Sequence, residues 1–466
     1  MRWITLLLLA GLSSVQAQSV TDRLTQALRV LEADPQLRHG LVGFCVVDAA
    51  TGKQLYGRNE QVGLAPASTQ KLFTAAAALE QLGPTFRYKT VIGYDGRLEN
   101  GLLQGNLHIL AYGDPTLGSN RWKETGRNYV LQQICDLLRE KNIRRIEGSL
   151  YINDTAFSIQ PLPGGWIWDD IGNYYGAGCW GLNWNENQYT LLLKTGNAEG
   201  APTQISGTDP ALAATDLVNE IRTGKKGSGD NGYIYLSPYS PRGFTQGTVP
   251  PGAAFSIAGA LPHPALLFAN ELEGALTAAG IPIAGRPLFY IDKTPAESWP
   301  AMQQVLGELS SPALSAITYW FLRKSINLYG ESLLRTMAYT KKGLGENNAG
   351  IEIVKSFWTE QGIDAGAMQL MDGSGLSPMN RVTADALVRV LQYARTRPWQ
   401  DAFYQALPEY NGMKMKSGSF GGARAYAGYH TSRAGKQYSF AIIVNNYDGS
   451  AGEVVKKMYR VLDVLK

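Results

Sequence analysis

Several residue types and patterns are scarce in this sequence, and each shortage excludes a class of protein. There are three cysteines, Cys45, Cys135 and Cys179, and their spacing fits no metal site. Cys45 lies in an apolar, strand-like run where a small buried side chain is expected, and the pairing of the three thiols stays open. The four histidines belong to no H-E-x-x-H motif, and no G-x-S-x-G occurs. We therefore expect no metal, no cofactor and no serine hydrolase of the G-x-S-x-G type.

Long apolar runs are also missing after the first residues of the chain. Arg2, the apolar run Ile4–Leu12 and the small residues Val15 and Ala17 follow the order of a secretory signal peptide, with cleavage expected near Gln18. No later run is long enough to cross a bilayer. The formal net charge is only +4, and no basic run with interleaved aromatics occurs, so we expect no nucleic-acid partner. The sequence predicts an exported protein, periplasmic or associated with the cell wall, without a transmembrane segment.

The remaining sequence is typical of a large globular protein with several domains. It has 466 residues, of which 44% are apolar, and 52 glycines. Long helical patterns occupy 311–339, 350–362 and 383–396, whereas 86–290 holds short strands separated by turn residues. We predict an α/β fold in which both ends of the chain build one domain, interrupted by a β-rich insertion of roughly 200 residues.

One short motif indicates chemistry. Ser68 and Lys71 form an S-x-x-K at the start of the Ala-rich segment Leu64–Gly83, for which we predict a helix. Residues three apart share a helix face, about 5–6 Å apart at Cβ. A lysine can take the proton of a serine hydroxyl if burial and a nearby cation lower its pKa. The alternative, a capping serine with a solvent-exposed lysine, is the usual interpretation of an isolated S-x-x-K, so the hypothesis needs partners.

Candidate partners occur later in the chain. Ser325-Ile326-Asn327 offers a second hydroxyl and an amide in a helical region, and two stretches compete to supply the cation. Lys194-Thr195-Gly196 lies in the insertion, where a strand end followed by a turn is the ordinary interpretation. Lys416-Ser417-Gly418 follows the S-x-N and leads into the strands predicted over 423–432 and 436–446. We therefore choose Lys416, with Gly418 letting a substrate lie against the backbone.

S-x-x-K, S-x-N and K-[ST]-G in this order resemble the pattern of the penicillin-recognising serine enzymes. The gap from Ser68 to Ser325, 257 residues (325 − 68), makes the chain resemble class C low-molecular-mass penicillin-binding proteins. These form the D-Ala-D-Ala carboxypeptidase/endopeptidase family. Further matching stretches are "APASTQKL", "YGDPTLGS", "KSINLYGESLLRT", "DGSGLS" and "KSGSFGGARAYAGY". The resemblance covers essentially the whole mature chain and is weakest within 190–260.

The resemblance implies a β-lactamase/transpeptidase-like catalytic domain with two inserted domains. The bounds that we predict are 1–17 for the signal peptide, 18–90 and 297–466 for the catalytic domain, 91–189 and 258–296 for inserted domain II, and 190–257 for inserted domain III.

The resemblance also implies roles for the motif residues. Ser68 is expected as the acylated nucleophile and Lys71 as its general base, and Ser325 is expected to relay a proton to the leaving D-Ala. Asn327 would hold a substrate amide or the Lys71 side chain. Lys416 would bind the terminal carboxylate and lower the pKa of Lys71.

The same strand is expected to bind the rest of the reacting group. Ser417 would share the carboxylate, and the backbone N–H groups of Ser68 and Ser419 would form the oxyanion hole. In the insertion, "GGWIWDDIGNYYGAG" resembles the stretch that binds the stem-peptide side chain. Asp170 there would pair with the free amine of a diamino acid and Tyr175 would pack on its methylenes.

Two features leave side-chain specificity open. Pro378 follows "SGLS" where related enzymes often carry an arginine, with Arg381 nearby, and "DGSGLS" itself is interpreted as a structural loop without a catalytic role. The expected substrates are peptidoglycan stem peptides, and the expected inhibitors are β-lactams, which acylate the serine. The alternatives are a β-lactamase or esterase with the same motifs, or an inactive cell-wall-binding module. Carboxypeptidase and endopeptidase action are not separated by the sequence, and neither is the oligomeric state.

Overall fold

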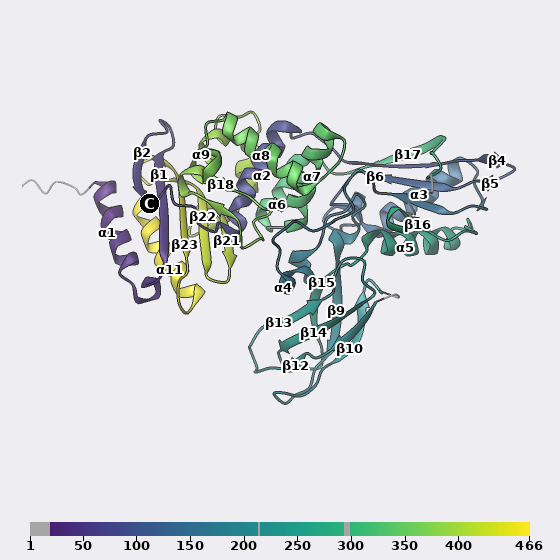
Figure 1. The fold of residues 1–466 in the computed structure, drawn as a ribbon, viewed down its shortest axis with the longest axis horizontal. Coiled ribbons are helices and arrows are strands. Elements are labelled where there is room, and N and C mark those ends of the chain that lie inside the picture. The colour runs from purple at the N-terminus through teal and green to yellow at the C-terminus, as the bar shows by residue number, and fades with distance from the viewer. Residues whose placement is uncertain (1–18, 213–214, 293–298) are drawn as a thin grey trace, which may run out of the picture.

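The computed structural model describes residues 19–212, 215–292 and 299–466 (Figure 1). The predicted signal peptide, 1–17, lies outside the described residues. In the part of the chain that is described, no helix is long and apolar enough to span a membrane. The molecule consists of a sheet with flanking helices, a lobe built around a second sheet, and a smaller β lobe below them (Figure 1).

The first sheet is antiparallel and joins strands from both ends of the chain in the order β2-β1-β23-β22-β21-β20. Its strands are Gln54–Arg58, Leu41–Asp48, Gln437–Asn445, Ala423–Thr431, Met413–Phe420 and Glu409–Tyr410. Helices α1 (Val20–Glu32) and α11 (Ala451–Leu462) cover one face, and a layer of helices covers the other (Figure 1). Phe440 and Ile442 of β23 pack toward the first pair, whereas Ala441 packs toward the helical layer. Burial of both faces explains why the middle of this strand, residues 440–444, is a continuous apolar run.

The helical layer carries the residues of the S-x-x-K and S-x-N motifs. It contains α2 (Lys71–Gln81), α6 (Leu314–Arg323), α7 (Asn327–Lys342), α8 (Asn347–Glu360), α9 (Ala384–Ala394) and α10 (Gln400–Ala406). The prediction of one helix over 311–339 is wrong, because the structure breaks it between α6 and α7. Ser325 has φ +58° at the break, and a left-handed residue cannot continue a right-handed helix.

The insertion forms two lobes. Its larger sheet has the order β16-β8-β6-β3-β17, with strands Leu288–Phe289, Leu150–Asn153, Leu107–Ala111, Lys89–Tyr94 and Gln304–Ser310. Helices α3 (Arg127–Glu140) and α5 (Pro264–Ala278) and the small sheet β4-β5-β7 (Arg97–Glu99, Leu102–Gln104 and Arg145–Ile146) belong to the same lobe. The lower lobe pairs β10-β9-β15 (Gln204–Asp209, Gln188–Lys194 and Phe255–Ala260) and gathers β11, β12 and β13 around β14 (Asp216–Asn219, Arg222–Thr223, Asn231–Tyr235 and Arg242–Val249).

The predicted fold class is confirmed: the protein is a multi-domain α/β structure whose first sheet joins both chain ends. The residue bounds given for the individual domains stay a prediction. The three cysteines are all free and buried, and Cys45 lies in β1 as a packing residue.

Candidate active site

Ser68 lies in the 3₁₀ turn Ala67–Gln70 that leads directly into α2. Ala67 has φ +45°, which turns the chain sharply before the serine, and Ser68 itself is half-buried. Strand β21 passes against this turn. A side chain at Gly418 would meet the carbonyl oxygen of Pro66 and lie 3.0 Å from the backbone nitrogen of Ser68. Only glycine therefore allows the strand to approach the serine so closely.

Lys71 is fully buried and directs its amine to three oxygens. Its Nζ lies 3.0 Å from Ser68 Oγ, 2.6 Å from Asn327 Oδ1 and 2.6 Å from the carbonyl oxygen of Ser374. Asn327 is itself oriented, because its Nδ2 donates to the carbonyl oxygen of Tyr175 at 2.7 Å. The S-x-x-K and S-x-N motifs thus meet around one nitrogen atom.

Burial is the main influence on the pKa values of Lys71 and Lys416. It lowers the pKa of Lys71 to about 7, while the carboxylates of Asp372 and Glu331 act in the opposite direction. Burial lowers the pKa of Lys416 well below its ordinary value, and the neighbouring charge of Lys71 lowers it further. Burial is thus the largest cause for both lysines, and the expectation that the charge of Lys416 also lowers the pKa of Lys71 stays a prediction.

A cavity of about 650 Å³ opens beside the serine. Its wall includes six residues of the predicted site: Ser68, Ser325, Asn327 and Ser419, together with Asp170 and Tyr175 of the insertion. Lys71 and Lys416 are buried outside this lining, at 0% and 1% exposure. The Lys416 Nζ donates to the carbonyl oxygen of Ser417 at 2.8 Å. Ser417 is half-buried, with its Oγ 3.4 Å from the hydroxyl of Tyr410.

The insertion contributes the opposite wall of the same cavity. Asp170 lies on the short helix α4 (Trp168–Ile171), and Tyr175 follows it; both line the cavity. Burial and the charge of Asp169 raise the pKa of Asp170 to about 6, against a hydrogen bond from Tyr175. Lys194, the rival of Lys416, ends β9 in the lower lobe and does not line the cavity.

Sequence reasoning missed the part played by the "DGSGLS" loop. Besides the Ser374 carbonyl that binds Lys71, the loop holds Asp372, which is 1% exposed and accepts hydrogen bonds from the backbone N–H groups of Gly375 and Ser377, each at 2.7 Å. Trp166 of the insertion donates to the same carboxylate at 2.9 Å. An aspartate followed by two glycines signals such a turn, although its position against Lys71 is not visible in the sequence.

Three ionisable residues also went unassigned from the sequence. Arg121 and Lys324 line the cavity, and Glu331 lies buried on α7, where its carboxylate accepts from the N–H of Gly373 at 3.0 Å. Burial raises the pKa of Glu331 to about 8. Arg381 does not line the cavity; its Nη1 donates to the carbonyl oxygens of Pro378 and Asn380. No cluster of His, Cys, Asp and Glu in the described ranges has the geometry of a metal site.

A serine beside a buried lysine, facing an S-x-N loop and a K-S-G strand, is the arrangement of the penicillin-recognising serine enzymes. With the large insertion, the fold and the site define a class C low-molecular-mass penicillin-binding protein. The sequence model of the D-Ala-D-Ala carboxypeptidase 3 (S13) family matches residues 24–409, and the chain belongs to this family. It is a serine-type D-Ala-D-Ala carboxypeptidase, so the resemblance stated from the motifs is confirmed.

Known proteins are similar over nearly the whole chain. A D-alanyl-D-alanine carboxypeptidase from an Actinomadura species is 30% identical, over 95% of this chain and 85% of the relative. A second carboxypeptidase of that name, from Haemophilus influenzae, is 25% identical over 90% of this chain and 88% of its own length. The crystal structure of penicillin binding protein 4 from Haemophilus influenzae has a TM-score of 0.78 and 23% identity, over 96% of this chain and 98% of that one, a likeness of fold.

Proposed function

We propose that Ser68 attacks the carbonyl carbon of the penultimate D-Ala of a peptidoglycan stem peptide and forms an acyl-enzyme, with Lys71 as general base. The contact that carries this proposal is the 3.0 Å approach of the Lys71 amine to Ser68 Oγ. A neutral amine has two N–H groups and one lone pair. The oxygens of Asn327 and Ser374 only accept, so they take both N–H groups and leave the lone pair facing the serine hydroxyl.

The breakdown of the tetrahedral intermediate needs a proton on the leaving amine. Ser325, in the cavity wall between α6 and α7, relays this proton from Lys71 to the departing D-Ala. Water then hydrolyses the acyl-enzyme, with Lys71 again taking the proton. Asn327 accepts from Lys71 through Oδ1 and donates to the carbonyl oxygen of Tyr175 through Nδ2. Held in this way, it positions Lys71 and the substrate amide relative to each other.

Strand β21 binds the reacting end of the substrate. Lys416 and Ser417 receive the terminal carboxylate, and a carboxylate beside Lys416 restores the ammonium charge that burial removes. The N–H groups of Ser68 and Ser419 bind the developing oxyanion, an interaction whose loss costs about 10²–10³ in rate. Support comes from Gly418, which brings the strand backbone against the turn of Ser68.

Asp170 and Tyr175 recognise the amine and methylenes of the diamino acid of the stem peptide. Burial raises the pKa of Asp170, and an arriving ammonium group stabilises its carboxylate form. Carboxypeptidase and endopeptidase action both cut a bond after D-Ala through the same acyl-enzyme, so we include DD-endopeptidase action, in which the amine of a second stem peptide is the leaving group. β-Lactams acylate Ser68 in the same way; one structure of the Haemophilus influenzae protein is described as a complex with a β-lactam.

We also propose that residues 1–17 are removed on export to the periplasm or cell wall, where the substrate lies. The domain bounds stated from the sequence, 18–90 with 297–466, 91–189 with 258–296, and 190–257, are proposed with the function; β17 (Gln304–Ser310), which falls within 297–466, pairs with β3 in the sheet of the inserted lobe.

Mass spectrometry after exposure to benzylpenicillin tests the proposal. We expect one stable adduct on Ser68, absent in Ser68→Ala and retained in Ser419→Ala, which changes another serine of the same cavity. Lys416→Ala should slow acylation strongly, whereas its matched control Lys194→Ala should not. Rapid turnover of the adduct would indicate a β-lactamase, and absence of any adduct would indicate an inactive binding module. Digestion of monomeric and cross-linked muropeptides then measures carboxypeptidase and endopeptidase action separately.

A further inference from the structure

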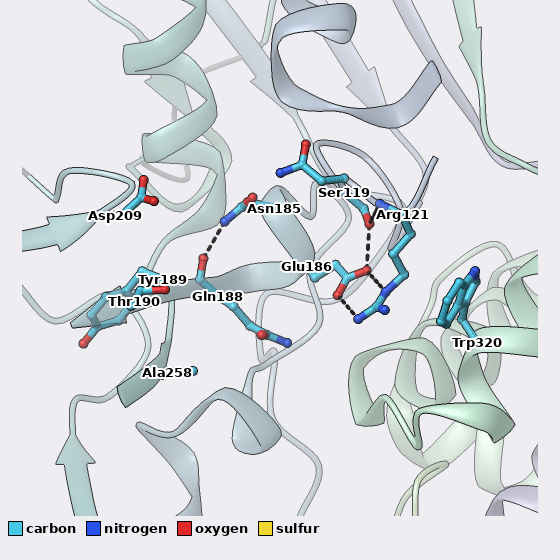
Figure 2. A pocket seen from close by; sticks show the side chains of 11 residues that line it. Ser119, Arg121, Asn185, Glu186, Gln188, Tyr189, Thr190, Asp209, Ala258 and Trp320 are labelled. Atoms are coloured by element: carbon cyan, nitrogen blue, oxygen red, sulfur yellow. Dashed lines mark hydrogen bonds and ion pairs between the residues drawn. The ribbon is translucent and has the colours of Figure 1, made fainter. Parts of the chain in front are cut away.

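A second cavity, of about 560 Å³, adjoins the first (Figure 2). Arg121 and Gln188 line both cavities, so a ligand in the first can continue past them into the second. Figure 2 shows Arg121 between Glu186 and Trp320, with Gln188 at the start of β9. None of the residues so far assigned to catalysis lines this second cavity.

The turn that builds its wall has an unfavourable backbone. Asn185, Glu186 and Asn187 have φ values of 56°, 54° and 52°, three consecutive left-handed residues without a glycine. Asparagine tolerates this conformation, whereas glutamate at the centre does not favour it. The turn is held by Asn187, whose Oδ1 accepts from the N–H of Trp184 at 2.9 Å and whose Nδ2 donates to the carbonyl oxygen of Gly178 at 2.9 Å. Such strain persists where surrounding contacts enforce it, often at functional sites.

The strained turn places the carboxylate of Glu186 so that it fixes Arg121. Glu186 accepts from Arg121 Nε at 2.6 Å and Nη2 at 3.0 Å, from Ser119 Oγ at 2.7 Å and from the Tyr329 hydroxyl at 2.7 Å. The guanidinium also lies over the ring of Trp320, 5.0 Å from its centre. Arg121 Nη1 takes part in neither bond to Glu186. Arg121 is therefore a preorganised donor at the junction of the two cavities.

The rest of the lining offers hydrogen-bonding groups beside the apolar surfaces of Tyr189, Ala258 and Trp320. Asn120, Asn185 and Gln188 contribute amides, and Thr190 contributes a hydroxyl beside Asp209, its partner across β9 and β10. Hydroxyl and acetamido groups are both donors and acceptors, and they match such a set. Stem-peptide carboxylates fit less well, because Glu186 already neutralises Arg121 and Asp209 adds a negative charge.

We propose that the second cavity binds an N-acetylated amino sugar of the peptidoglycan glycan strand while the attached stem peptide occupies the first. This inference rests on the proposed function, since it takes the stem peptide as the ligand of the first cavity. Sugar recognition makes the enzyme prefer glycan-linked stem peptides over free peptides.

A substrate pair tests the preference. We compare kcat/KM for a pentapeptide ending in D-Ala-D-Ala with kcat/KM for the same peptide carrying the N-acetylglucosaminyl-N-acetylmuramic acid disaccharide. For the native enzyme we expect a ratio of about ten in favour of the sugar-bearing substrate, equivalent to about 1.4 kcal/mol. Thr190→Trp fills the second cavity and should bring the ratio to about one. Leu192→Trp is the matched control, on the same strand and face but outside the cavity, and should keep it.

Two further measurements keep the outcome decisive. The rate of benzylpenicillin acylation reports whether Thr190→Trp is folded, and Asn120→Ala, an exposed position, should lower the ratio partially without a folding risk. Saturation-transfer NMR with the disaccharide alone reports sugar binding without catalysis. A ratio near one in the native enzyme, or equal losses on both substrates in Thr190→Trp, overturns the sugar site. Failure to cleave either peptide, with disaccharide binding intact, overturns the proposed function instead.

Discussion

The pH dependence of acylation gives the sharpest prediction. Lys71 acts as base only when it is neutral, and burial lowers its pKa from 10.5 to about 7. A pKa of about 7 in place of 10.5 corresponds to about 5 kcal/mol of differential stabilisation of the neutral form. At pH 7 about half of the molecules then hold a neutral Lys71, against roughly one in 3,000 for an unperturbed lysine.

The second-order rate of acylation by a fluorescent penicillin, measured from pH 5 to 9, should rise tenfold per pH unit at low pH. It should level off above about pH 7. Asp372→Asn removes a negative charge that raises the pKa of Lys71, so the rising limb of the pH–rate profile of this variant should move to lower pH. Asp401→Asn, which changes a carboxylate on α10, is the control and should leave the limb in place. A limb that levels only above pH 9, or one that moves upward in Asp372→Asn, refutes the reasoning.

Three other perturbations follow from the same contacts. Lys71→Met should abolish acylation yet raise the unfolding temperature at pH 6. The pKa of Lys71 is lower in the folded protein than in the unfolded chain, so the gain in stability of the variant is present below pH 7 and disappears as the pH rises toward 10.5. Calorimetry at several pH values measures this gain. Gly418→Ala should lower the acylation rate at least about 100-fold, since the added carbon displaces β21 from the Ser68 turn, and a normal rate would contradict this approach. Asp170→Asn should lower kcat/KM about 10- to 100-fold for stem peptides with a free side-chain amine, because one charged hydrogen bond is lost. The variant should not change the rate of benzylpenicillin acylation. Equal effects on the peptide and on benzylpenicillin would exclude amine recognition by Asp170.

Much of the protein is predictable because its signals are local. The S-x-x-K spacing places Ser68 and Lys71 on one turn, whatever surrounds them. The apolar strands near both chain ends need a common core, which predicts that distant segments share a sheet. Motif order then separates Lys416 from Lys194, since only one of them follows the S-x-N.

The break at Ser325 was not predictable in the same way. The residues from 311 to 339 have good helical periodicity, and nothing in them signals a left-handed residue. The break exists because the serine and Asn327 must face the cavity and Lys71, a requirement set by the packing of α2 against α7. Periodicity describes one helix at a time and carries no information about that contact.

The sequence by itself determined the chemical groups of the site, their order along the chain and the fold class. Only the tertiary structure decided that Lys71 is buried away from water, that the Ser374 carbonyl oxygen accepts a hydrogen bond from its amine, and that Arg121 lines two cavities. Desolvation is a collective property: it arises when segments hundreds of residues apart exclude water from one nitrogen atom. No spacing within a motif can encode it.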